Sequence, residues 1–217
     1  MSSRVKITIV GDQSVGKTSF INVCFRESIS SDYIPTVFDN YTNDVSFRNS
    51  TTRIAFFDTG GATEYSLLAR LSYPNTDIFL ICFDISNPNS LSNVVTRWYQ
   101  DIRSNVNDPT IILVGLKKDL RNNRSIIQQL SELGQEPVSR EEAMLKCREI
   151  NAIDYFECSA LLNEGINEVI ISAIENSTIH PSEELHSSTK LGKLLLKMRK
   201  KLGPKFYFHK KTHFHNI

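Results

Sequence analysis

Short apolar segments rich in Val, Ile and Phe alternate with longer amphipathic segments along most of this chain. The pattern predicts strands at residues 5–10, 42–47, 53–57, 78–83, 111–114 and 155–157. It predicts helices at residues 18–25, 90–104, 140–150 and 166–176, and Ser139 with Glu142 forms a capping box that opens the third of these helices. Such alternation is typical of a mostly parallel sheet with helices packed on it. The polar stretch 48–52 predicts one antiparallel hairpin within that sheet.

A phosphate-binding motif follows the first predicted strand. Residues 11–18 read Gly-Asp-Gln-Ser-Val-Gly-Lys-Thr, which fits G-x-x-x-x-G-K-[ST] at a helix start. In such a loop, backbone N–H groups hold phosphate oxygens, the lysine neutralises the β and γ phosphates, and the threonine hydroxyl ligates Mg²⁺. The predicted nucleotide contacts here are Asp12, Gln13, Ser14, Val15, Gly16, Lys17, Thr18 and Ser19.

Asp58 ends the strand predicted at residues 53–57, where a carboxylate can hold Mg²⁺ through water. The simpler alternatives are a glycine turn with a surface lysine at residues 11–18 and a capping role for Asp58. The pairing of Lys17 upstream with a strand-end acid downstream favours the nucleotide site over both.

Five further stretches resemble the small GTPases of the Rho family over about residues 4–178. They are Tyr33-Ile34-Pro35-Thr36-Val37-Phe38-Asp39-Asn40-Tyr41, Leu71-Ser72-Tyr73-Pro74, Ile78-Phe79-Leu80-Ile81-Cys82-Phe83, Ile111-Ile112-Leu113-Val114-Gly115 and Glu157-Cys158-Ser159-Ala160-Leu161. The resemblance implies an α/β fold of the P-loop NTPase small G domain type. It further implies a six-stranded, mostly parallel sheet with one antiparallel strand, helices on both faces, and a Rho-type insert helix at about residues 122–137. We expect a G domain at residues 1–179 and a basic C-terminal tail at 180–217.

The resemblance also assigns roles by position. Thr36 is similar to the switch I threonine that closes on Mg²⁺ and the γ-phosphate, and Tyr33 to the tyrosine that covers the phosphates. Lys117 and Asp119 resemble the pair that reads guanine, which would select GTP and GDP over adenine nucleotides. Further expected contacts are Gly61 in switch II, Ser159 and Ala160 at the base, Thr18, Thr36 and Asp58 at Mg²⁺, and Val37, Phe38, Asp39, Asn40 and Tyr41 on the effector-binding edge.

Four positions depart from the family pattern. Ala62 stands where the family has the glutamine that orients the attacking water, and a methyl group cannot do so. Gln13 replaces a glycine close to the γ-phosphate and is expected to crowd the water and any arginine finger. Ile29 replaces a phenylalanine that stacks across the base, and Leu116 replaces a residue that hydrogen-bonds to the phosphate loop. Together these changes predict slow hydrolysis and quick exchange, although Gln13 could itself reach the water.

Charge is distributed unevenly although the formal net charge is only +1. Residues 185–217 hold nine basic and no acidic side chains, which leaves 16 basic and 24 acidic ones in residues 1–184. Leucines recur at helical spacing within 191–202, so the tail predicts a basic amphipathic helix. No Cys follows Cys158, so prenylation at a C-a-a-X box is not expected. We expect a cytosolic chain that associates with an anionic inner membrane surface. A solvated disordered tail, a nuclear localisation or RNA-contacting signal, and a helix docked on the acidic body remain as alternatives.

Taken together, these features predict an atypical Rho-like switch that binds GTP or GDP with Mg²⁺, rests mostly in the GTP form and signals through effectors at switch I. By resemblance its pathway is the actin cytoskeleton, exchange factors and GTPase-activating proteins are expected partners, and nucleic acid is not favoured. Two alternatives stay open. One is a cycling GTPase whose hydrolysis depends on an activator or on Gln13, and the other is a nucleotide-free pseudo-GTPase scaffold.

Overall fold

The computed structural model describes residues 3–25, 36, 38–47, 50–62, 66–177, 180–181 and 212–214. Three residues with expected roles, Ile29, Tyr33 and Val37, lie outside this part of the chain. So does most of the basic tail, including the predicted amphipathic helix.

Six strands form the expected sheet, whose order is β6-β5-β4-β1-β3-β2. Their bounds are β1 (Ser3–Gly11), β2 (Phe38–Phe47), β3 (Ser50–Thr59), β4 (Ile78–Asp84), β5 (Ile111–Leu116) and β6 (Asp154–Glu157). Neighbouring strands are parallel except for β2 and β3, which form an antiparallel pair in register from Phe38 opposite Thr59 to Phe47 opposite Ser50. The sequence-based prediction of a mostly parallel sheet with one antiparallel strand is therefore confirmed.

Two short strands extend this sheet beyond the six that were expected. β7 (His180–Pro181) pairs antiparallel with the start of β1, and β8 (Thr212–Phe214) pairs parallel with β2 at Thr42–Asp44. β8 comes from the region assigned to the tail, and its pairing lies beyond the Phe38–Tyr41 part of β2.

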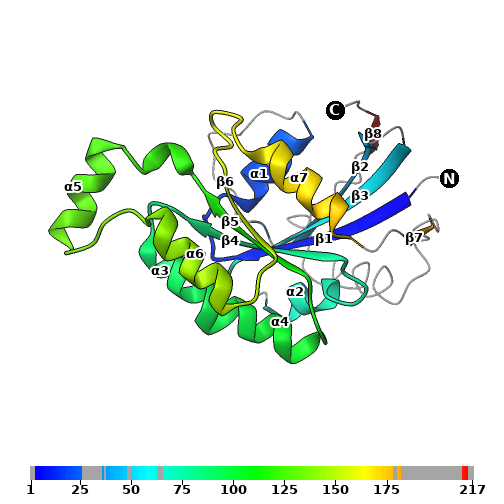
Figure 1. The fold of residues 1–217 in the computed structure, drawn as a ribbon, viewed down its shortest axis with the longest axis horizontal. Coiled ribbons are helices and arrows are strands. Elements are labelled where there is room, and N and C mark those ends of the chain that lie inside the picture. The colour runs from blue at the N-terminus through cyan, green and yellow to red at the C-terminus, as the bar shows by residue number, and fades with distance from the viewer. Residues whose placement is uncertain are drawn as a thin grey trace, which may run out of the picture.

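Helices cover both faces of the sheet (Figure 1). α1 (Lys17–Cys24) and α7 (Ile166–Glu175) lie on one face, where they share a core with the inward side chains of the central strands. The other face carries α2 (Ser66–Ser72), α3 (Pro88–Asn93), the π-helical segment η2 (Val94–Tyr99), α4 (Gln100–Asn105) and α6 (Arg140–Glu149). The β4 strand is buried along its whole length because both layers cover it.

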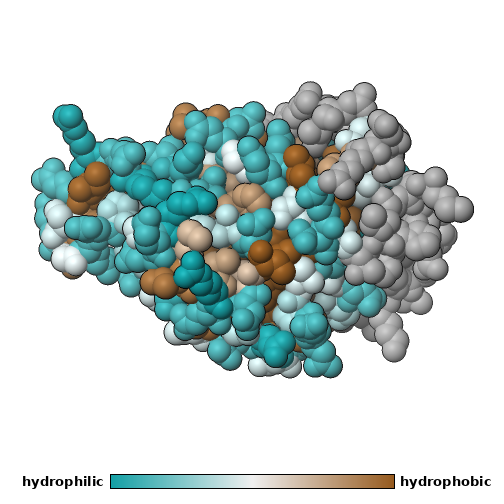
Figure 2. All heavy atoms as spheres, viewed as in Figure 1, coloured by the Kyte–Doolittle hydropathy of each residue, from teal (hydrophilic) through white to brown (hydrophobic). Residues whose placement is uncertain are grey.

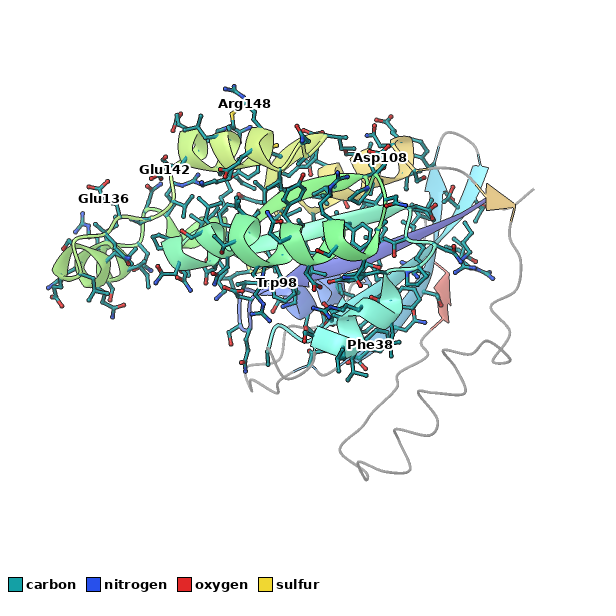
Figure 3. The ribbon with its side chains drawn as sticks, turned by 90° about the horizontal axis from the view of Figure 1, so that it is seen from below. Phe38, Trp98, Asp108, Glu136, Glu142 and Arg148 are labelled. Atoms are coloured by element: carbon teal, nitrogen blue, oxygen red, sulfur yellow. The ribbon has the colours of Figure 1, made fainter. Side chains whose placement is uncertain are left out.

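The helix predicted at residues 90–104 is one continuous run of α3, η2 and α4 that contains a π-helical segment. Trp98 in η2 is 2% exposed and lies where this run meets the sheet (Figure 3). α2 and the short 3-10 turn η3 (Lys118–Leu120) were not predicted. At α6, the Ser139 hydroxyl accepts from the Glu142 N–H while the Glu142 carboxylate accepts from the Ser139 N–H, so the predicted capping box is confirmed.

The insert expected at about 122–137 contains α5 (Arg124–Glu132), whose first turn is capped by the Asn123 side chain. α5 projects from one end of the molecule (Figure 1). Ile127 in α5 and Leu133 just after it are exposed. Figure 2 shows hydrophobic atoms on the surface at that end of the molecule. Among the residues described, no helix combines the length and hydropathy that crossing a bilayer requires.

Candidate functional site

The phosphate loop joins β1 to α1 and is shaped by residues with left-handed backbone. Gly11 has a φ of 148° and lies so close to β4 that a Cβ there would overlap the carbonyl oxygen of Cys82. Ser14 and Gly16 also have positive φ values, of 63° and 107°. The loop can make these turns only because small residues stand at them, and it delivers Lys17 to the first turn of α1.

Lys17 is 6% exposed, and its Nζ donates to the carbonyl oxygens of Gly11 and Asp12, both at 2.8 Å. Burial lowers the pKa of Lys17, and the nearby carboxylate of Asp58 works in the opposite direction. Within the part of the chain that the structure describes, the ammonium group donates hydrogen bonds to these two backbone oxygens.

Three oxygen-bearing side chains from different elements meet beside this lysine. The Thr18 hydroxyl donates to Asp58 Oδ2 at 2.6 Å, and the Thr36 hydroxyl lies 2.8 Å from that of Thr18. Since Thr18 has a single hydroxyl proton, which Asp58 accepts, Thr36 is the donor in the second hydrogen bond. The three predicted metal residues are therefore brought together.

Asp58 has an unused coordination position. The residue is fully buried at the end of β3, and its Oδ1 has no hydrogen-bond partner among the residues that the structure describes. Burial raises the pKa of Asp58, while Lys17 and the Thr18 hydroxyl oppose the rise. Hydroxyl and carboxylate oxygens are the donors that Mg²⁺ prefers, so this set of residues fits Mg²⁺.

The predicted base-reading residues lie in two loops that contact each other. Asp119 Oδ1 accepts from the buried Ser159 hydroxyl at 2.5 Å, and the Lys118 N–H donates to the Cys158 carbonyl at 2.9 Å. Lys117 has left-handed backbone, with a φ of 57°, and its Nζ donates to Asp84 Oδ2 at 2.7 Å. The protein residues that are expected to contact guanine thus lie in neighbouring loops, and Ala160 directly follows Ser159.

Leu116 is buried near the phosphate loop, which sequence reasoning did not anticipate. It is 2% exposed, and a Cβ placed on Gly16 would lie 3.8 Å from Leu116 Cδ1 and 3.7 Å from Lys117 Cε. Leu116 belongs to the hydrophobic core that also includes Val15 of the phosphate loop. The quick exchange expected from this position stays a prediction.

Sequence reasoning also missed the ion pair that joins the two base loops. Arg121 donates to Glu157 through NH1 at 2.6 Å and NH2 at 2.8 Å, and the Tyr155 hydroxyl donates to Glu157 at 2.8 Å. Burial alone would raise the pKa of Glu157, but the hydrogen bonds from Arg121 and Tyr155, together with the charges of Arg121 and Arg140, outweigh it. The pKa of Glu157 therefore lies below its ordinary value. The sequence did contain a signal for this pair, because Arg121 stands two residues after Asp119 and the oppositely charged Glu157 two residues before Ser159.

The expected effector edge is only partly exposed. Phe38 packs against Phe57, and Tyr41 packs against Phe25, so both aromatic side chains are buried. Asp39 and Asn40 are half-buried, and Asp39 lies opposite Asp58 across the strand pair. Burial, with a smaller contribution from Asp58, raises the pKa of Asp39 to about 7.

Switch II begins directly against the phosphate loop. A Cβ added to Gly61 would overlap Gln13 N and the Asp12 backbone, so only glycine fits there. Gln13 is exposed and Ala62 is half-buried, and the Gly61 contact places these two departures from the family pattern at the same point of the site.

Comparisons with known proteins agree with this architecture. A family model described as "Ras family" matches residues 6–178. The GTP-binding protein rho5 of Schizosaccharomyces pombe is 40% identical over 81% of this chain and 88% of its own length. The GTP-binding protein RHO1 of Eremothecium gossypii is 41% identical over 81% of this chain and 85% of its own length.

The Arg121–Glu157 pair gives a pH-dependent prediction. Because the folded state lowers the pKa of Glu157, the unfolded chain binds more protons as pH falls below about 4.5, and the native state loses this stabilisation. We expect Glu157→Gln to lower the free energy of unfolding at pH 7 by about 1–3 kcal/mol and to flatten its decline in acid. Urea unfolding between pH 7 and 3 measures both effects.

Glu164→Gln is the matched control, since its ion pair with Lys118 is exposed on both sides. That substitution should change the free energy of unfolding by less than about 0.5 kcal/mol. Equal acid sensitivity in the wild type and Glu157→Gln would contradict the assignment.

Proposed function

Because the chain belongs to the Ras family and, within it, to the Rho-type small GTPases, we propose that it is a signalling switch that rests mainly in the GTP-bound form. Guanine nucleotide binding follows from the family. The finer roles proposed here rest on the residues of this chain. The observation that carries the proposal is the contact between Gly61 and Gln13 beside Ala62. Ala62 has a methyl side chain where the family usually has the glutamine that orients water.

In this proposal the nucleotide phosphates lie on the loop of residues 12–19, with Lys17 against the β and γ phosphates. The buried Nζ of Lys17 supports that role because its present partners are neutral carbonyl oxygens. Asp119 accepts from the guanine N1–H and exocyclic amine, Ser159 holds the Asp119 carboxylate in place, and the Lys117 stem packs on the base plane. Tyr33 would cover the phosphates.

Mg²⁺ supplies charge neutralisation at the β and γ phosphates when it is bound. Thr18 and Thr36 would contribute hydroxyl oxygens, and Asp58 would hold the ion through water with its unpartnered Oδ1. The proposal explains why a carboxylate is buried at the end of β3 with one oxygen unused.

Slow hydrolysis is proposed because the methyl side chain of Ala62 can neither donate a hydrogen bond to water nor accept one from it. The Gln13 side chain stands next to the same point and is expected to obstruct both the water and an inserted arginine. The exposure of Gln13 supports the alternative of a cycling GTPase, since the exposed side-chain amide could reach the attacking water itself. The hydrolysis rate separates the two functions.

The test is single-turnover hydrolysis by protein preloaded with GTP and Mg²⁺, followed through released phosphate. We expect a rate at least roughly tenfold below the intrinsic Ras value of about 3–5 × 10⁻⁴ s⁻¹. The double variant Gln13→Gly with Ala62→Gln should raise the rate towards that value. Turnover at the Ras rate by the wild type, or no gain in the double variant, would contradict the proposal that Gln13 and Ala62 slow hydrolysis.

A nucleotide-free scaffold is the remaining alternative, and binding of a fluorescent GTP analogue excludes or supports it directly. The metal role is tested with a fluorescent GDP analogue. We expect chelation by EDTA to accelerate release of a fluorescent GDP analogue from the wild type. Asp58→Asn should release it quickly with or without EDTA, because the amide cannot supply the missing negative charge. Equal EDTA sensitivity in both proteins argues against metal binding by Asp58.

Effectors are proposed to bind the edge of β2 at Asp39 and Asn40, which are its half-buried expected contacts.

The excess of nine basic side chains in residues 185–217 supports a second contact, with an anionic membrane surface. Engagement of about half of these charges at roughly 1 kcal/mol each would match the binding of a single acyl chain.

Vesicle co-sedimentation tests the membrane contact. We expect the full chain to bind vesicles that contain phosphatidylserine more tightly than phosphatidylcholine vesicles, and increasingly weakly as salt rises. Replacing Lys200 and Lys201 by Gln should weaken binding. The control replaces Lys118 and Lys146, which make exposed ion pairs on the domain. Equal losses from the two pairs would point to non-specific charge attraction.

A further inference from the structure

One helical run contacts the phosphate loop through the side chain of Asp12. The Trp98 Nε1–H donates to Asp12 Oδ1 at 2.8 Å, and the Asn93 amide donates to Oδ2 at 2.7 Å. Arg97 NH1 lies 3.7 Å from Oδ1. All three groups come from the end of α3 and from η2. This helical run therefore holds the loop from the face of the sheet that α3 and η2 cover.

Arg97 reaches beyond Asp12 to switch II. Its NH2 donates to the carbonyl oxygen of Gly61 at 3.2 Å, and its guanidinium lies over the Trp98 ring, 4.2 Å from the ring centroid. The Arg97 side chain is 30% exposed, so solvent weakens but does not remove these interactions. Stacking on a buried indole and the nearby Asp12 carboxylate restrict the guanidinium to the orientation in which it meets Gly61.

Gly61 is therefore held by two different contacts. Its Cα lies against the Asp12–Gln13 peptide so closely that no Cβ fits, and its carbonyl is bound by Arg97. Arg97 does not touch the loops that would read the base, since its described contacts are Asp12, Gly61 and Trp98. Any effect of Arg97 on a nucleotide should thus be felt at the phosphate end.

We propose that Arg97 is a positioning residue that holds switch II at Gly61 against the phosphate loop and thereby favours the triphosphate over the diphosphate. The inference rests on the proposed binding of the nucleotide phosphates to residues 12–19. Gly61 meets the loop at Gln13, the position nearest the third phosphate, so a switch II fixed there contributes contacts that GDP cannot use. The geometry also explains the value of a planar guanidinium over an ammonium at position 97, because the side chain must stack and donate at once.

Dissociation of two fluorescent nucleotides, a GDP analogue and a non-hydrolysable GTP analogue, tests the proposal at saturating Mg²⁺. Arg97→Met should release the GTP analogue roughly three- to tenfold faster, as expected for the loss of one partly exposed hydrogen bond, while release of the GDP analogue changes by less than about twofold. Arg97→Lys should give an intermediate ratio. Arg103→Met, an exposed arginine of α4, is the control and should change neither rate.

Trp98→Phe separates positioning from general loosening of the phosphate loop. It removes the hydrogen bond to Asp12 but retains an aromatic surface for Arg97, so it should speed release of both analogues by a similar factor. Urea unfolding of each variant shows whether the fold is kept, and Arg97→Lys provides the measurement if Arg97→Met does not fold.

Equal changes of the two release rates in the Arg97 variants, or no change in either, would overturn the positioning role while leaving nucleotide binding intact. Failure of the wild type to bind either analogue would overturn the proposed function, and this inference with it.

Discussion

A cation and an anion are buried at the same edge of the sheet, and much of the site follows from the need to satisfy them. The side chains of Lys17 and Asp58 are both buried, and burial destabilises the charged form of each. Each opposes the other's pKa shift. Among the described residues, Lys17 donates to carbonyl oxygens and Oδ1 of Asp58 has no hydrogen-bond partner, so both groups can accept a further ligand. Phosphate oxygens beside Lys17 and a divalent cation beside Asp58 would supply the missing charges together.

The end of the site that would read the base is organised by a different kind of interaction. Arg121 and Glu157 form a two-point ion pair with Glu157 mostly buried, and this pair joins the loop after β5 to the loop after β6. The Asp119–Ser159 hydrogen bond closes the same junction nearer the expected base. Because both loops are fixed to each other, recognition of a ring depends less on ordering the protein at the moment of binding. Leu116 and Val15 of the phosphate loop belong to the same hydrophobic core, which lies beneath both ends of the site.

Periodicity and motifs predicted the elements whose residues repeat with a clear period or carry a cap. The six main strands and the α6 capping box are of this kind. α2 was missed because its seven residues are too few to establish a helical period, and the π-helical segment was missed because propensity does not distinguish it from an α-helix. The motif located Lys17, Thr18 and Asp58, but it could not reveal that Asn93, Arg97 and Trp98 converge on Asp12. Their contacts join positions more than 80 residues apart in the chain.

The network around Arg97 bears on how a switch can lack the usual glutamine and still respond to its nucleotide. In the proposed function, the glutamine that orients water is replaced by Ala62, whereas sensing of a third phosphate would need only that the backbone at Gly61 be held near it. The Gly61 carbonyl bound to Arg97 and the glycine packed against Gln13 supply that second requirement. On this proposal, catalysis and sensing would be separable. A chain that keeps the sensing contacts while losing the catalytic one would signal for as long as GTP stays bound, with its duration set by exchange.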